Sequence, residues 1–159
     1  MIIAPYKRDL LYRKAQGNSL RERYKEKLNF LLGTAPQDAL FLSLIETDEI
    51  IKNLLERKKI LTENAEFATL DECIKYDLSR EIVSECYLLL DGDWRYCGAY
   101  LCRNFNFNPE FDFNKFQSDE IRLISTDFVT EIAIDYSETY SETLIEFRIS
   151  KYAPVKIAG

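Results

Sequence analysis

Hydrophobic residues in the first third of the chain recur at the spacing of an α-helix. Residues 6–16 predict a short helix, and Gly17 is the residue expected to end it. A second helix is predicted over residues 20–32, because the Ser-x-x-Glu capping signature at Ser19 precedes leucines at helical spacing. Gly33 follows the last of these leucines, so we expect the second helix to end there.

The following segments also favour helices. Residues 38–45 are almost entirely apolar, and their pattern fits either a buried helix or a central strand. We expect a helix, because Thr47 looks like the N-cap of a further helix that follows it. Lys58 and Lys59 would lie at the carboxyl end of that further helix. Thr69 opens a last short helix with a second capping signature. Residues 1–78 are therefore predicted to be mainly helical.

Beyond residue 84 the hydrophobic positions alternate every second residue, as they do in β-strands. Residues 85–90 and 94–102 flank an Asp-Gly dipeptide at 91–92 that favours a tight hairpin turn. This hairpin would place Cys86 directly opposite Cys97. Further strands are predicted at residues 120–125, 129–136 and 143–149.

The order of these elements predicts an α+β fold. Three or four N-terminal helices would pack on one face of a C-terminal antiparallel sheet of about five strands. A tandem Tyr-Ser-Glu-Thr repeat at residues 136–143 is expected to form the turn of the final hairpin. Residues 84–153 would be mainly β, and residues 1–159 would form a single domain, because domains cluster near ~100–150 residues.

Aromatic residues alternate with polar ones between residues 104 and 116. Phe105, Phe107, Phe111 and Phe113 share one side of this stretch if it is extended. On the helix-facing side of the sheet they would belong to the core. At an edge or on the open face they would form an apolar patch with an acidic rim, which suits a basic partner.

Charge is distributed unevenly along the chain. Residues 1–30 carry eight lysines and arginines against three acidic residues, whereas the remainder carries 13 against 24. Between Glu110 and Glu146 there are ten acidic residues and two basic ones. Such a surface repels phosphate backbones and attracts basic proteins, so we expect a basic protein partner and no nucleic acid. The plainer interpretation is that these acidic residues keep the surface soluble.

Residues with catalytic or metal-binding character are sparse. The chain has no histidine, which removes the commonest general base and metal ligand and disfavours an enzyme. The five glycines form no phosphate-binding motif, and Asp91 and Asp93, a conceivable cation pair, are explained by the turn between them. We therefore expect no cofactor and no metal.

The four cysteines fit no metal-ligand spacing and indicate free thiols in a reducing compartment. No apolar run approaches the ~20 residues that span a bilayer. These observations lead us to expect a cytoplasmic protein without a membrane partner.

The acidic, aromatic second half favours a protein-binding inhibitor of the immunity or antidote type. Such a protein would neutralise a basic toxin or effector, for example a nuclease, through an acidic surface that carries aromatic side chains. The candidate partner-binding residues are Phe111, Asp112, Glu131, Asp135, Tyr136, Glu138, Tyr140 and Glu142. A secretion-type chaperone with an acidic groove fits the same features.

Two other classes of function remain open at this point. One is a small-molecule-binding module or enzyme with an aromatic-lined pocket between the helices and a curved sheet. Its candidate polar groups are Tyr87, Tyr96 or Tyr100 beside Glu85. The other is a structural subunit that forms a homodimer through an edge strand at residues 111–116.

Overall fold

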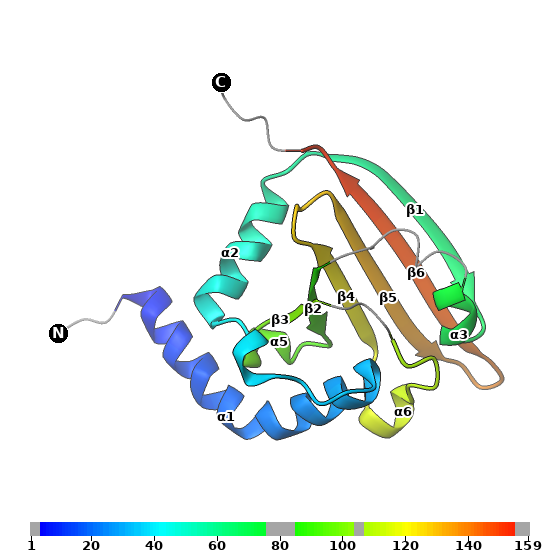
Figure 1. Ribbon diagram of the computed structural model, residues 1–159, viewed down its shortest axis with the longest axis horizontal. Helices are drawn as coiled ribbons and strands as arrows, with labels where there is room; N and C mark the ends of the chain where they lie inside the picture. Colours follow the sequence, from blue (N-terminus) through cyan, green and yellow to red (C-terminus); the bar gives the residue numbers. More distant parts are fainter. Residues whose placement is uncertain (1–3, 76–84, 104–106, 155–159) are drawn as a thin grey trace.

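The computed structural model describes residues 4–75, 85–103 and 107–154. Its helices and strands follow one another in the order drawn in Figure 1: α1 (Pro5–Leu32), the 3₁₀ helix η1 (Asp38–Leu40), α2 (Leu44–Leu55), β1 (Lys59–Phe67), α3 (Leu70–Cys73), β2 (Cys86–Leu90), α5 (Trp94–Cys97), β3 (Tyr100–Cys102), α6 (Phe113–Phe116), β4 (Glu120–Ser125), β5 (Thr130–Glu138) and β6 (Thr143–Tyr152). The fold is α+β, as the sequence predicts.

The strands form one antiparallel sheet of six strands in the order β1-β6-β5-β4-β2-β3. The predicted final hairpin is confirmed, because β5 pairs with β6 along its whole length. The tandem repeat forms its turn and the adjoining strand ends, and the Thr139 amide donates to the Glu142 carbonyl at 2.9 Å. In Figure 1 the sheet curves, with β1 and β6 on the right and with α1 and α2 on the left.

Helix α1 is continuous through Gly17, where the sequence predicted a break. A Cβ atom on Gly17 would lie 2.2 Å from the Tyr96 carbonyl oxygen, so this glycine lets α1 approach α5 closely. The Ser19 hydroxyl donates to the Gln16 carbonyl inside the helix at 2.8 Å and caps nothing. Gly33 ends α1 in the left-handed conformation, as predicted.

The apolar segment at residues 38–45 is not the helix we expected. It begins with η1, continues as extended chain, and contributes its last two residues to α2. Ser43, not Thr47, is the N-cap of α2, and it forms a capping box with Glu46. Thr47 lies inside the helix. Its buried hydroxyl donates to the Ser43 carbonyl and accepts from the Ala99 amide.

Two strand assignments also differ from the prediction. Lys59 begins strand β1, which lies in the half expected to be helical and pairs along its length with β6. Residues 94–97 form α5 and not a strand. The hairpin partner of β2 is therefore the short strand β3, and Cys86 faces Cys102, not Cys97. None of the four cysteines, all of them described residues, forms a disulfide, and the pKa of Cys86 is raised by its contact with Cys102 and by burial.

The helices cover both faces of the sheet, whereas the sequence predicted one covered face. Residues Tyr24 and Leu28 of α1 belong to the main core with Leu88 and Leu90 of β2. Leu89 points to the opposite face, because side chains alternate along a strand. There it forms a second cluster with Ile50 and Leu54 of α2 and with Ile124 of β4.

The phenylalanine stripe is core, in accord with one of the two interpretations. Phe107, Phe111 and Phe113 are buried in the main cluster, and Phe105 lies outside the described residues. Residues 113–116 form α6, so the edge strand expected to support a homodimer at residues 111–116 is absent there. The edge strands of the sheet are β1 and β3.

Candidate functional site

Four carboxylates lie side by side across the sheet. Glu66 of β1 is paired with Glu146 of β6, Glu146 with Asp135 of β5, and Asp135 with Glu120 of β4. Residues that face each other in an antiparallel ladder point to the same side of the sheet, about 4.8 Å apart from strand to strand. We call these four residues the acidic row.

The acidic row has little internal counter-charge, since the cation that acts on Glu120 is Arg122, whose own partner is Glu131. Within residues 4–75, 85–103 and 107–154, no member of the row forms an ion pair. Burial raises the pKa of Glu120, and the nearby charge of Asp135 raises it further. A raised pKa means that the native state holds this carboxylate in a setting that disfavours its charge.

Two arginines occupy the next position along the strands, on the side away from the hairpin. Arg122 is held by Glu131, with 2.6 Å between Nε and Oε2, and its charge is thereby matched. Arg148 is exposed and faces Ala133 of β5. The negative potential of the acidic row therefore extends toward the β5–β6 hairpin.

Helix α2 covers the other end of this face. It packs on Leu89 and Ile124, and Ile124 lies four residues beyond Glu120 on the same strand. Glu66 and Glu146 are exposed, and Glu120 and Asp135 are half-buried. The row thus borders the open part of the sheet and is available to a partner.

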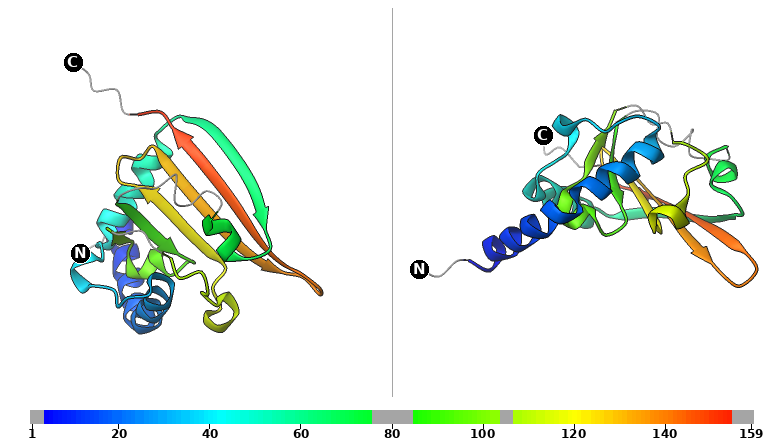
Figure 2. Two further views of the ribbon diagram at one scale, coloured as in Figure 1. Left: turned by 45° about the vertical axis from the view of Figure 1, so that its right-hand side comes forward. Right: turned by 90° about the horizontal axis from the view of Figure 1, so that it is seen from below.

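The β5–β6 hairpin continues beyond the row and projects from the rest of the fold, as the right-hand view of Figure 2 shows. At its tip the Tyr140 side chain is fully exposed, with a relative accessibility of 112%. Glu138 and Glu142 flank it and are exposed as well. An aromatic side chain with acidic neighbours and no intramolecular packing is typical of a contact residue in a protein interface.

A groove of about 320 Å³ lies beside the base of the hairpin, between α3 and α6. Asp112 lines it and caps α6, where its carboxylate accepts from the Lys115 amide at 3.1 Å. Tyr136 lines it too; its ring stacks on Phe113 with centroids 4.7 Å apart, and its hydroxyl accepts from Asn114.

The structure separates the eight candidate residues into three groups. Five of them are at least partly exposed at the hairpin and the groove: Asp112, Tyr136, Glu138, Tyr140 and Glu142. Phe111 also lines the groove, but its side chain belongs to the core. Asp135 is in the acidic row, on the opposite face of β5 from Tyr136. Phe111 and Glu131 are buried, at 5% and 8% accessibility.

Glu131 has a structural partner set that accounts for its burial. Besides Arg122, it accepts a hydrogen bond from the Tyr152 hydroxyl at 2.9 Å. Sequence reasoning did not single out Glu66, Glu120 and Glu146. Two of these lie in the acidic stretch, but their alignment depends on strand register, and Glu66 lies in a strand that the pattern missed.

The carboxylates of Asp91 and Asp93, considered above as a cation pair, are bridged by an ammonium group. Lys27 of α1 is 3% exposed, and its Nζ lies 2.8 Å from Asp91 and 3.0 Å from Asp93. Burial opposes the charge of Asp91, but Lys27 and the amides of Glu120 and Asp119 lower its pKa overall. Across the described part of the chain, no group of three or more acidic or cysteine side chains is placed to hold a metal.

The polar groups suggested for an aromatic pocket are dispersed. Tyr100 is buried, and its hydroxyl accepts from the Gln37 amide. Tyr96 lines a pocket of about 300 Å³, but this pocket lies between α1, α5 and residues 42–45 and has no carboxylate in its lining. Tyr87 packs against Phe128 on the α2 face.

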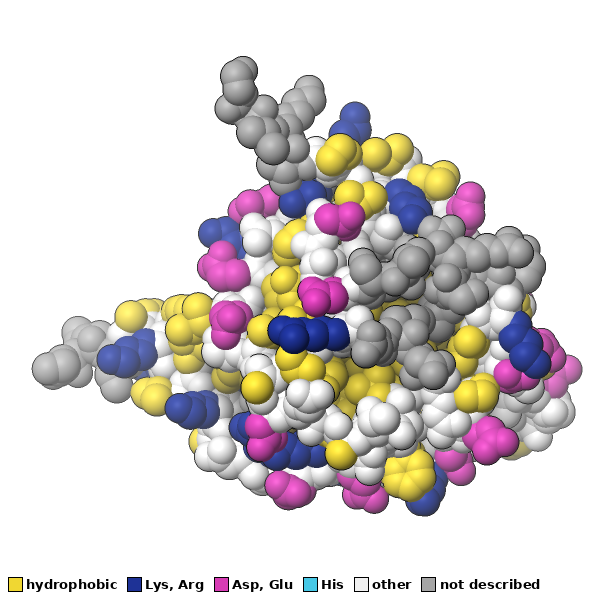
Figure 3. Space-filling view, viewed as in Figure 1, with side chains coloured by type: hydrophobic (Ala, Val, Ile, Leu, Met, Phe, Trp, Pro, Cys, Tyr) yellow, Lys and Arg dark blue, Asp and Glu magenta, His cyan; other side chains and the backbone are white. Residues whose placement is uncertain are grey.

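Comparison with protein-family models, curated proteins and solved structures finds no match to this chain. The site is therefore interpreted from its own geometry. Among the helices of the described residues, none combines the length and apolar character that crossing a membrane requires. Figure 3 shows basic side chains along α1 at the lower left and acidic side chains at the right-hand and lower margins.

Proposed function

We propose that this protein binds and neutralises a basic protein, such as a nuclease toxin, through the acidic row and the β5–β6 hairpin. The observation that carries the proposal is the alignment of four carboxylates across four adjacent strands. Like charges placed directly opposite each other destabilise a sheet. A basic partner supplies the ion pairs that the described residues do not form with the row.

The spacing of the row suits a basic helix. Neighbouring strands lie about 4.8 Å apart, so the row extends over roughly 14 Å. Lysines and arginines three or four residues apart on a helix are about 5–6 Å apart, which is close to the strand spacing. A helix that crosses the strands can therefore present one cation to each carboxylate in turn.

The hairpin adds an anchor to this electrostatic surface. Tyr140 is a large, rigid side chain at the tip, and burying it against a partner would contribute affinity that charge alone does not. The carboxylates of Glu138 and Glu142 extend the acidic potential to the tip. An acidic surface steers a basic protein during encounter, which raises the association rate.

The proposal places the protein in the cytoplasm, where free thiols persist. The four cysteines are thiols without a disulfide, and the two that face each other, Cys86 and Cys102, are buried. A protein of this kind protects the cell that makes the basic toxin, so it acts in the compartment where the toxin is made.

The experiment is capture of partners from the native lysate, with washes at low and high salt and identification by mass spectrometry. The test variant is Asp135→Lys with Glu146→Lys, and the control is Glu22→Lys with Glu26→Lys on α1, which changes net charge equally. One stoichiometric basic protein, held by the wild type and the control but not by the test variant, supports the proposal. Loss from both variants would show attraction by net charge alone and would contradict it.

Neutralisation is then measured with the captured partner. An equimolar amount of the wild-type protein should abolish the partner's activity, for example cleavage of a nucleic acid. The test variant should leave that activity intact at the same concentration. A partner that stays fully active while bound would contradict inhibition and would fit the chaperone alternative.

A further inference from the structure

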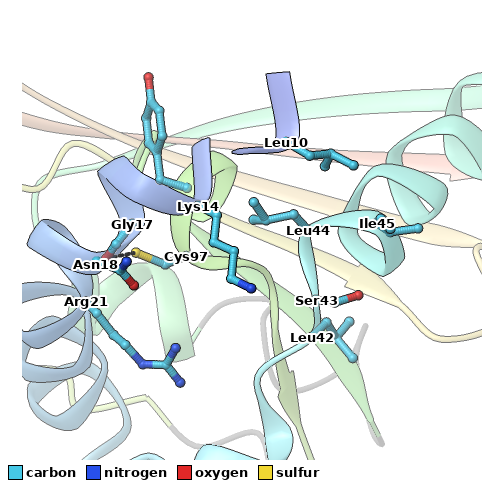
Figure 4. Close-up of a pocket in the computed structure, with 11 residues that line it drawn as sticks. Leu10, Lys14, Gly17, Asn18, Arg21, Leu42, Ser43, Leu44, Ile45 and Cys97 are labelled. Carbon is cyan, nitrogen blue, oxygen red and sulfur yellow. Dashed lines mark hydrogen bonds between the residues drawn. The ribbon is translucent and has the colours of Figure 1, made fainter. Parts of the chain in front are cut away.

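A pocket of about 300 Å³ lies where α1 passes residues 42–45 and α5. Figure 4 shows its walls. The apolar part of the lining comes from α1 and from the segment that leads into α2: Leu10, Leu42, Leu44 and Ile45. This volume lies at the lower end of the range found for small-molecule sites.

Two cations border the same pocket. Lys14 and Arg21 are seven residues apart on α1, so they lie on one side of the helix, two turns apart. Figure 4 shows Lys14 extending from α1 toward Ser43 and Leu42. The Arg21 guanidinium lies over the Phe41 ring, 5.7 Å from its centroid, and this contact restrains its position.

The charge of this lining is not matched from within. No carboxylate lines the pocket, and in the described ranges neither Lys14 nor Arg21 forms an ion pair. The pocket therefore combines an apolar lining with two cations on α1. A ligand that complements it has an apolar body and an anionic group.

The walls are held at a fixed separation by two direct backbone contacts. A Cβ on Gly17 would lie 2.2 Å from the Tyr96 carbonyl oxygen, and one on Gly98 would lie 2.1 Å from that of Leu42. The Leu42 amide donates to the Ala99 carbonyl at 2.9 Å. Because backbone meets backbone on both sides, binding requires little rearrangement of the pocket.

Cys97 lies in the lining, and its environment favours binding over covalent chemistry. Burial raises the pKa of its thiol to about 11, with a further contribution from Asp93. Its sulfur lies 3.9 Å from the Gly17 carbonyl oxygen. A neutral thiol is a poor nucleophile and behaves as a small apolar group.

We propose that this pocket binds a small amphipathic anion, with its apolar chain against Leu42, Leu44 and Ile45 and its carboxylate or phosphate between Lys14 and Arg21. The site is built by α1, α5 and residues 42–45, whereas the proposed partner surface is built by β1, β4, β5 and β6. The two proposals therefore stand or fall separately.

The test is isothermal titration calorimetry of the full chain with octanoate, octyl phosphate and octanol. Either anion should bind saturably, and octanol should bind at least about tenfold more weakly because it lacks the charge. The tighter of the two anions identifies the natural head group. Equal binding of octanol, or no saturable binding of either anion, would overturn the proposal.

Variants locate the site. Lys14→Gln with Arg21→Gln should weaken binding of the tighter anion by about tenfold or more, since both cations contact its charged group. Lys7→Gln with Arg8→Gln removes the same charge from an exposed part of α1 and should leave the affinity within about twofold. Circular dichroism verifies that both variants fold. Equal weakening by the two variants would indicate unspecific attraction to α1 and would refute the assignment.

Discussion

Removing one charge from the acidic row should make the protein more stable. Asp135 faces Glu120 on one side and Glu146 on the other, so Asp135→Asn relieves two like-charge pairs while keeping the size of the side chain. A cross-strand pair contributes about 0.2–1 kcal/mol, so the two pairs together imply a gain of about 0.4–2 kcal/mol at neutral pH and low salt. Urea unfolding measures this gain as a rise in the midpoint at unchanged slope.

The gain should depend on pH in a defined direction. The pKa of Glu120 is raised in the native state, by burial and by the charge of Asp135, so native Glu120 binds a proton more readily than the unfolded chain does. The repulsion is therefore complete above this raised pKa and fades as the pH falls through it. The stability difference between Asp135→Asn and wild type should shrink from about pH 7 toward about pH 4.

Glu63→Gln is the matched control, because Glu63 lies on β1 outside the row and faces Ile149. Its effect should stay within about 0.5 kcal/mol and should not follow the pH dependence of Asp135→Asn. If Asp135→Asn destabilises the protein, or if it matches the control at every pH, the row carries no electrostatic strain. The argument that a partner must supply its counter-charge would then fail.

Three further predictions concern other parts of the fold. Lys27→Met removes the cation that Asp91 and Asp93 share in a largely buried site, and it should destabilise by about 3 kcal/mol in urea unfolding. Lys25→Met, which breaks an exposed pair, should change stability by at most about 1 kcal/mol; equal losses would contradict the first. Tyr140→Ala should leave the midpoint within about 0.5 kcal/mol of wild type while weakening partner binding, because the ring is fully exposed; a large loss of stability would show that it packs on the fold. Gly17→Ala should lower the melting temperature, because the alanine Cβ would meet the Tyr96 carbonyl. This clash should outweigh the helix propensity of alanine, which is about 1 kcal/mol better than that of glycine. A higher melting temperature would contradict the close approach of α1 and α5.

Local signals explain what the sequence predicted correctly. The β5–β6 hairpin combines strict alternation with a polar turn, and both are properties of neighbouring residues. Gly33 ends α1 through its own left-handed conformation. The α+β class follows from the order of such segments and needs no knowledge of long-range contacts.

Several of the wrong predictions involve contacts between distant residues. Gly17 was taken as a helix end, but its role is to admit the Tyr96 carbonyl, which no local pattern records. Thr47 was taken as an N-cap, but its hydroxyl bonds the Ala99 amide. Strand β1 has mostly exposed side chains, so it lacks a hydrophobic signal and is defined by its pairing with β6.

The candidate site shows the same division. Composition alone indicated an acidic second half, and Asp135 and the residues of the hairpin were identified from it. The row itself required the register of four strands, which brings Glu66 beside Glu146 although 80 positions separate them. Glu131 shows that position in the acidic stretch is not enough, because this residue is buried in an ion pair with Arg122.

The most direct test of the central claim is the affinity of the purified basic partner for the wild type and for Asp135→Lys with Glu146→Lys, measured by titration calorimetry at about 150 mM salt. The account predicts that reversing these two charges weakens binding by at least about a hundredfold, and that Glu22→Lys with Glu26→Lys stays within about threefold of wild type. Equal affinities of the two variants would contradict it, because the partner would then not contact the acidic row.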